Sequence, residues 1–443
     1  MNKVRIVFLT FGLFVCSPAV FGQDLLSLPQ AIEFALENNY DVRISKKTEK
    51  VAETNVTRGN AGFLPTVGAS TTKNYSRNNT YQERVIGDSI AIREANGVKS
   101  ESFNIGANVN WTVFDGLGMF YTFERLDAQK DVSSYQLKVT MENMIAELTS
   151  AYYTVAVEQE RVDVLENSIQ LSERRLEIAK NKYELGKASK VEYLAAQVDY
   201  NADRTALMNE EQLLYRSKVD LNQVMARETS IDFVVDSVIN IDQELEMSML
   251  IESANAQNPT LLQLQRQLNV AYLQIQEVKS ARYPVVSLFG GYSKSTNISP
   301  LSFAPFQKNA GLNYGLTATL NIFNGFNTER QIQVAKIQME TSELNISKQK
   351  LSLEADINRN FYNYQTSKEL IEIERQNLAV AKENENIALE RYQLGNSTPL
   401  ELREAQINAV QAESRLINAA FSTKLAEIEL LRLSGSLVTT FSE

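Results

Sequence analysis

The side chains of this sequence that could take part in chemistry are mostly carboxylates. The chain of 443 residues contains no histidine, and its only cysteine is Cys16. Since histidine is the commonest general base and metal ligand, its absence disfavours triad catalysis and histidine-based metal centres. Glu401 and Glu404 lie three residues apart and therefore share one face of a helix, and Glu192 lies in a similar setting. Carboxylate acid–base chemistry stays open, but no acid pair lies in a cleft-like context. We expect no enzyme and no cofactor.

These acids follow a turn that occurs twice. Equivalent residues such as Tyr183 and Tyr392 are 209 positions apart (392 − 183). In each copy a helical segment stops at a glycine, Gly186 or Gly395, crosses a short polar stretch and restarts. Glycine adopts the left-handed conformation that ends helices at little cost, and Pro399 suits a first helical turn. One copy alone fits an ordinary surface turn, but two copies in register indicate a duplicated architecture with two helical hairpins. The acids are then equally explained as solvated first-turn residues that favour a helix N-terminus.

Very long helices lead into both turns. The segments 120–185 and 326–394 contain no proline and almost no glycine, so each is predicted to be a helix about 100 Å long. Helices of this length need partner helices along their sides, and 189–225 and 399–433 are predicted to return beside them.

The second returning helix carries a coiled-coil pattern. Apolar or small residues recur in alternating steps of three and four, with Thr423 as the exception, at Leu402, Ala405, Ala409, Ala412, Leu416, Ala419, Ala426, Leu430 and Leu433. Ile337, Leu344 and Leu351 show seven-residue spacing in the preceding helix. An ordinary helix-bundle core explains this pattern equally well.

Two predicted β-hairpins precede the long helices. Residues 103–113 alternate strictly between apolar and polar side chains, and 312–322 repeat the pattern, as in strands with one apolar face. Their partner strands are predicted at 67–75 and 285–292, each after a predicted helix, 26–61 or 245–281. Residues 76–100 are predicted to be a polar loop, about ten residues longer than its counterpart in the second hairpin. Four such strands leave exposed edges, so in a membrane several copies must pool them, and the alternation is typical of an outer-membrane barrel.

Composition and the N-terminus limit the cellular context. The formal charge of −10 argues against nucleic acid as a partner. Residues 1–22 are predicted to be a signal peptide with a basic start and a short apolar region. Lipidation at Cys16 is a rival, but the bulky Val15 before it disfavours that reading. The domain plan is 23–228 for the first repeat, 229–244 for a linker, 245–435 for the second repeat and 436–443 for a tail.

The chain resembles the TolC family of outer-membrane efflux channels. The matching motifs are Leu64-Pro65 and Tyr283-Pro284, Phe114-Asp115-Gly116 and Phe323-Asn324-Gly325, and the Tyr-x-Leu-Gly turns at Tyr183 and Tyr392. The resemblance implies a mainly α fold with a membrane β-barrel part: a homotrimer in outer-membrane lipid, whose twelve strands form one barrel and whose helices form a periplasmic tunnel. The turns would meet a periplasmic adaptor protein attached to an inner-membrane pump.

The resemblance also implies roles for turn residues. Glu192, Glu401 and Glu404 would ring the pore entrance, and Tyr392 would be a gate residue. Adaptor contacts would come from Gly186, Lys187, Ala188 and Ser189 and from Gly395, Asn396, Ser397 and Thr398. Ser397 departs from the family, some members of which have an arginine there that ties neighbouring helices shut. Nothing in the sequence shows that Arg403 replaces that link.

Other classes stay open at this stage. A periplasmic coiled-coil adaptor or scaffold without a pore shares the helical hairpins, but it should carry compact β domains of its own. Within the preferred class, drug efflux, metal efflux and type I protein secretion use the same kind of channel, and the sequence does not separate them.

Overall fold

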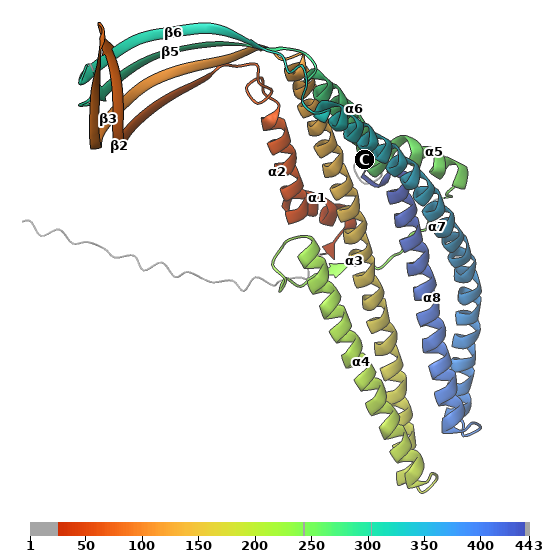
Figure 1. Ribbon diagram of the computed structural model, residues 1–443. Coiled ribbons are helices and arrows are strands. Elements are labelled where there is room, and N and C mark those ends of the chain that lie inside the picture. The colour runs from red at the N-terminus through yellow and green to blue at the C-terminus, as the bar shows by residue number, and fades with distance from the viewer. Residues whose placement is uncertain (1–24, 242–243, 303, 439–443) are drawn as a thin grey trace, which may run out of the picture. The chain divides into compact units, whose positions relative to one another are not determined.

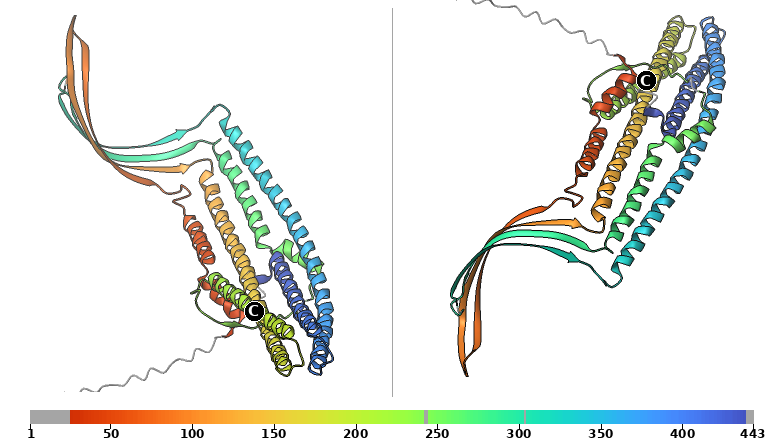
Figure 2. Two further views of the ribbon diagram at one scale, coloured as in Figure 1. Left: turned by 90° about the horizontal axis from the view of Figure 1, so that it is seen from below. Right: turned by 90° about the horizontal axis from the view of Figure 1, so that it is seen from above.

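The computed structural model describes residues 25–241, 244–302 and 304–438 (Figures 1 and 2). The predicted signal peptide and Cys16 lie outside the described residues. The helices are α1 (Leu28–Asn38), α2 (Tyr40–Asn55), α3 (Gly118–Glu184), α4 (Lys190–Val224), α5 (Met247–Gln257), α6 (Pro259–Ser280), α7 (Asn327–Gln393) and α8 (Pro399–Ser434). The strands are β1 (Leu25–Leu26), β2 (Thr66–Ile86), β3 (Ser89–Phe114), β4 (Val234–Val235), β5 (Val285–Ile298) and β6 (Phe306–Thr319).

The predicted duplication of helices is confirmed. The long helices α3 and α7 have 67 residues each, and the returning helices α4 and α8 have 35 and 36. Both halves begin with a helix broken at an asparagine. The side-chain amide of Asn39 donates to the carbonyl of Val224, and that of Asn258 donates to the carbonyl of Leu433. Carbonyls in the last turn of a helix have no hydrogen-bond donor within that helix. In each half, the asparagine at the break supplies a donor to one such carbonyl of the returning helix.

The four long strands form one antiparallel sheet in the order β2-β3-β5-β6, so β2 and β6 are its edges. One row across the sheet pairs Val67, Val109, Gly290 and Tyr314, and the next row pairs Gly68, Asn108, Gly291 and Asn313. The predicted alternation is confirmed: one face is largely apolar, and the other carries Asn, Gly, Ser and Thr.

The prediction of a loop at 76–100 is wrong. β2 and β3 remain paired as far as Ile86 and Ser89, with a β-bulge between Asn78 and Thr80 (Figure 2). The connection is the two-residue turn Gly87-Asp88, in which Gly87 has φ 61°. The extra residues of the first hairpin thus lie in its strands, because inter-strand hydrogen bonds form irrespective of side-chain polarity. Two further boundaries also differ: α2 ends at Asn55, well before Pro65, and β6 ends at Thr319.

The coiled-coil pattern of α8 corresponds to buried residues. Eight of its nine positions are buried, and Thr423 is buried too, with its hydroxyl donating to the carbonyl of Ala419 at 2.8 Å. The heptad in α7 behaves differently, because Ile337, Leu344 and Leu351 are 58%, 70% and 70% exposed in the single chain.

The chain divides into two compact units that each draw on both halves of the repeat. The first contains the described residues up to Asn39, Met144–Glu244 and Tyr362–Ile428, and the second contains Tyr40–Asn143, Leu245–Phe361 and Glu429 onward. The first unit therefore holds both hairpin turns, and the second holds the four-stranded sheet. Among the described helices, none combines the length and apolar character needed to cross a membrane.

Glu142 provides a pH-dependent test of the packing in the second unit. Its side chain on α3 is 5% exposed, and the N–H of Val438 donates to its Oε1 at 3.4 Å. Burial raises the pKa of Glu142 to about 7, and the positive charge of Arg432 opposes this shift. Since the folded pKa exceeds the ordinary value, the native state binds more protons, and stability falls as the pH rises from about 4.5 through 7.

We predict that Glu142→Gln, which mimics the protonated acid, raises the thermal unfolding midpoint at pH 8 and leaves it nearly unchanged at pH 5. Circular dichroism of the protein in detergent would measure both midpoints. The control is Glu343→Gln at an exposed position of α7, which should have no pH-specific effect. Equal midpoints of Glu142→Gln and wild type at pH 8 would contradict the assignment.

Candidate functional site

Both helical hairpins end in the same backbone turn, as the repeated sequence predicts. Gly186 has φ 71° and Gly395 has φ 79°, so both adopt the left-handed conformation that side chains disfavour. A six-to-one hydrogen bond closes each helix: the N–H of Lys187 donates to the carbonyl of Lys182 at 2.8 Å, and that of Asn396 donates to the carbonyl of Arg391 at 2.8 Å.

The returning helices are capped alike. The hydroxyl of Ser189 accepts the N–H of Glu192 at 3.3 Å, and the hydroxyl of Thr398 accepts the N–H of Glu401 at 3.2 Å. Each cap satisfies one free N–H group of a helix start. These matched caps fix the two turns in the same conformation, although their polar residues differ.

Each turn presents two exposed apolar side chains at equivalent positions. Leu185 and Leu394, which precede the glycines, are 71% and 77% exposed, and Val191 and Leu400, at the starts of the returning helices, are both 74% exposed. Sequence reasoning missed these four residues, although the leucines belong to the repeated Tyr-x-Leu-Gly motif. Apolar side chains exposed at both turns form a candidate docking surface.

The two tyrosines of the motif lie in different environments. Tyr183 is 39% exposed and stacks on Tyr193, with ring centroids 6.0 Å apart. Tyr392 is only 3% exposed, because Lys182 of α3 lies over its ring at 4.1 Å and donates to its carbonyl at 3.0 Å. Burial raises the pKa of Tyr392, and the nearby charge of Glu192 raises it further. The predicted gate tyrosine thus joins the second hairpin to the first.

The three predicted entrance acids are not equivalent. Glu192 is half-buried, whereas Glu401 and Glu404 are exposed. The hydroxyl of Ser397 donates to Glu401 Oε2 at 2.7 Å. Ser397, which replaces the arginine of some family members, therefore holds one of the acids. The structure therefore places Glu192 near Tyr392 and leaves the other two carboxylates at the surface of the second turn.

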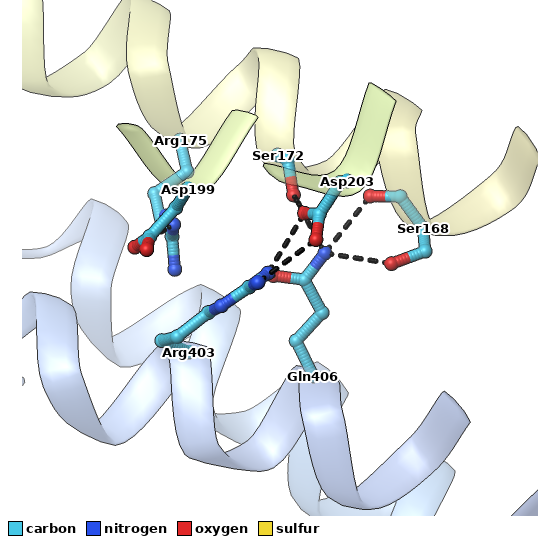
Figure 3. Close-up of polar contacts among 7 residues, drawn as sticks. All are labelled: Ser168, Ser172, Arg175, Asp199, Asp203, Arg403 and Gln406. Carbon is cyan, nitrogen blue, oxygen red and sulfur yellow. Dashed lines mark hydrogen bonds and ion pairs between the residues drawn. The ribbon is translucent and has the colours of Figure 1, made fainter. Parts of the chain in front are cut away.

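A polar cluster joins α8 to helices α3 and α4 of the first helical hairpin (Figure 3). Arg403 donates from both terminal nitrogens to Asp203 of α4, at 2.7 and 2.8 Å. Asp203 also accepts the hydroxyl of Ser172, and Arg175 of α3 pairs with Asp199 of α4. Hydrogen bonding to Asp203 raises the pKa of Arg403. Arg403 is therefore committed to a partner in its own chain.

Gln406 completes this cluster. It is 1% exposed, and its amide donates to the carbonyl and hydroxyl of Ser168 at 2.9 Å each and to the hydroxyl of Ser172 at 2.7 Å. Its counterpart in the repeat, Gln197, is exposed. Sequence reasoning missed Gln406, the serines, Asp203 and Arg175 as a cluster, because the crossing of three helices brings them together.

Comparisons with known proteins give a consistent result. A family model described as "Outer membrane efflux protein" matches residues 31–227 and 250–436. Protein CyaE of Bordetella pertussis is 22% identical over 429 residues, which cover 95% of this chain and 86% of CyaE. Outer membrane protein TolC of Escherichia coli is 20% identical over 432 residues, covering 93% and 82%. The Campylobacter jejuni CmeC outer membrane channel has the same fold, with a TM-score of 0.76 at 14% identity over 98% of this chain and 94% of that one.

We predict that the Arg403–Asp203 pair is energetically coupled. A bidentate pair with side chains 18% and 13% exposed should give a coupling of about 1–2 kcal/mol in a double-mutant cycle. Arg403→Ala and Asp203→Ala should each lower the thermal unfolding midpoint, and the double variant should fall hardly further.

The control cycle uses Lys382 and Glu413, an ion pair between α7 and α8 whose side chains are 49% and 27% exposed. More exposed pairs contribute little, so its cycle should be nearly additive. Additive losses in the Arg403–Asp203 cycle would show that this pair does not join the hairpins.

Proposed function

The chain belongs to the outer membrane efflux protein family, and we propose that three copies of it form one duct whose hairpin turns receive a periplasmic adaptor. As a TolC-family protein it is an efflux channel of the outer membrane and not an enzyme. We propose the trimer, the adaptor with its inner-membrane pump, and the roles of individual turn residues.

The observation that carries the proposal is a surface that is buried in the first half of the repeat and exposed in the second. Tyr153 on α3 is 8% exposed, because Lys424 of α8 lies over its ring, whereas its counterpart Tyr362 on α7 is 70% exposed. Val164 is 7% exposed and its counterpart Ile373 is 53% exposed. The stripe continues along α7 through Val380 and Ile387, which are 67% and 49% exposed.

The complementary surface is also exposed. In the first half α8 covers α3, and the helix equivalent to α8 is α4. The corresponding side of α4 carries exposed apolar residues, namely Leu194, Val198, Met208 and Tyr215 at 45%, 67%, 63% and 64%. We infer that α4 of one copy covers α7 of the next, as α8 covers α3 within the chain. Such a head-to-tail contact generates a closed ring when its rotation closes.

The sheet supports the same assembly. β2 and β6 leave one row of unpaired backbone groups each, which hydrocarbon does not satisfy. Joining the β6 edge of each copy to the β2 edge of the next would remove every edge. With the three copies typical of the family, the sheet closes as twelve strands, with the apolar face toward lipid and the Asn, Gly, Ser and Thr face toward water.

We predict that Val380→Asp abolishes the trimer, because it buries an unpaired carboxylate in the proposed contact between copies. Native mass spectrometry of the protein in detergent would report a monomer in place of a trimer. The control is Ala379→Asp. The counterpart of Ala379 on α3 is Gln170, which is exposed and shows that α8 leaves that side of α3 uncovered. A trimeric Val380→Asp variant would refute the assigned surface.

The turns are proposed to contact the adaptor. Support comes from their matched backbone and their four exposed apolar side chains, which offer an apolar docking surface at equivalent points of both hairpins. The residues proposed to contact the adaptor beside these side chains are Gly186, Lys187, Ala188 and Ser189 and the equivalent Gly395, Asn396, Ser397 and Thr398.

We predict that Gly395→Val reduces export by at least tenfold in cells that carry the cognate adaptor and pump, while trimer assembly and membrane insertion persist. A β-branched residue at φ 79° costs roughly 1–2 kcal/mol and distorts the turn, although nothing within 4 Å would touch its Cβ. Gly395→Asn is the matched control, since asparagine tolerates this conformation. Wild-type export by the valine variant would count against docking at the turn.

Glu192, Glu401 and Glu404 are proposed to line the entrance together with Tyr392. Threefold symmetry would gather nine carboxylates (three from each of three copies) around a narrow opening. Such a ring attracts cations over a range of about 8–10 Å at moderate salt.

We predict that the double variant Glu401→Gln, Glu404→Gln assembles normally, because both side chains are exposed. In planar bilayers at low salt it should show lower cation selectivity and weaker block by multivalent cations added from the periplasmic side, and Glu192→Gln should act in the same direction. The matched control is Glu383→Gln, Glu390→Gln, two exposed acids of α7. If selectivity and block match wild type, the glutamates are only solvated helix-start residues.

A further inference from the structure

Up to the β-bulge that follows Asn78, the charged residues of the four-stranded sheet all lie on its apolar face. The polar face carries no charged residue in β2 from Thr66 to Asn78, nor in the described residues that pair with this segment on β3, β5 and β6. The apolar face carries one acid, Glu101, and five cations. We call these cations the cation rim: Lys73, Arg77, Lys99, Lys294 and Lys308.

The cation rim lies toward the turns of the two β-hairpins and away from the helices. Lys294 pairs with Ile105, and Lys73 pairs with Phe103 one row further out. Lys308 lies in the same row as Lys73, and Arg77 and Lys99 pair with each other two rows beyond. The rows nearer the helices contain Val109, Trp111 and Val113 and no charge on this face.

The spacing along the strands puts the rim at a membrane boundary. From Val113 to Ile105 a strand advances about 26 Å at 3.3 Å per residue, or about 20 Å of thickness at a tilt near 40°. An outer-membrane apolar band is about 25 Å tall. The cation rim therefore begins where the apolar band ends, at the end of the sheet that lies away from the helices.

The placement of these cations is not explained by solvation of the sheet or by pairing within the chain. Charges that only kept the sheet soluble would favour the polar face. Lys73 pairs with Glu101 at 2.8 Å, and no ion pair within the described residues involves the other four cations. Lys73 and Lys308 lie over the rings of Tyr75 and Phe306 at 5.0 and 5.1 Å, as expected where apolar stems and charged heads meet a membrane interface.

We propose that the cation rim binds the phosphate groups of phosphorylated glycolipids in the outer leaflet. The inference rests on the proposed orientation of the sheet, with its apolar face toward lipid. Because Lys73 lies on edge strand β2 and Lys308 on edge strand β6, each junction between copies has rim cations on both strands. Four positive charges in excess of the single acid complement anionic headgroups, which attract clustered Lys and Arg residues at membrane surfaces.

The test measures lipid binding to the full-length trimer in detergent by native mass spectrometry. The probes are bisphosphorylated lipid A and the same lipid with both phosphates removed. Wild type should bind the phosphorylated form at least tenfold more tightly. The variant Lys294→Gln, Lys308→Gln should lose about tenfold of that affinity and bind the dephosphorylated lipid as wild type does.

The control variant Lys336→Gln, Lys350→Gln removes the same charge from exposed positions of α7 and should bind lipid A normally. Equal binding of the two lipids, or unchanged binding by the rim variant, would overturn the proposal. Displacement of the lipid by equimolar inorganic phosphate would show a site for free phosphate and would also overturn it. Conductance in planar bilayers distinguishes failure of this proposal from failure of the proposed function. A wild-type trimer that conducts but binds both lipids equally refutes only lipid binding by the cation rim. A wild-type protein that neither assembles nor conducts refutes the proposed function.

Discussion

The packing of α8 against the first helical hairpin is the interaction on which the organisation of the hairpins depends. It buries Tyr153 and Val164 and supplies the carboxylate that Arg403 requires. Because the chain is an internal duplication, the same surface exists a second time on α7 without a cover. One chain satisfies one of the two equivalent contacts, and in the proposed assembly a neighbouring copy satisfies the other.

The asymmetry between the two halves has a mechanical consequence at the turns. Tyr392 is held by Lys182, and Gln406 is held by the serines of α3, whereas Tyr183 and Gln197 are exposed. The contact between Lys182 and Tyr392 therefore ties the two turns to each other, and it buries the tyrosine of the second turn and not that of the first. In the proposed duct, opening of the entrance would break the Lys182 and Arg403 contacts, which are charge-assisted and partly shielded from water.

The sheet separates its two environments by residue type. Up to the β-bulge after Asn78, its polar face carries neutral side chains, most of them Asn, Gly, Ser and Thr, with exceptions that include Phe289 and Gln307. Its apolar face changes from hydrophobic to cationic along the strands. In the proposed duct, any charge selectivity lies at the turns and contact with charged lipid lies at the cation rim.

The sequence by itself determined the repeat, the long helices and the alternating strands, because these depend on local properties: absence of proline, left-handed glycines and residue periodicity. It did not reveal that residues 76–100 continue as paired strands, since polar side chains do not prevent backbone pairing. The burial of Tyr153 and the exposure of Tyr362 were decided only by tertiary structure. Both residues are tyrosines at equivalent positions, but α8 covers Tyr153 and leaves Tyr362 exposed. The partner of Arg403 was likewise set by the crossing of α4 and α8, which joins residues 200 positions apart.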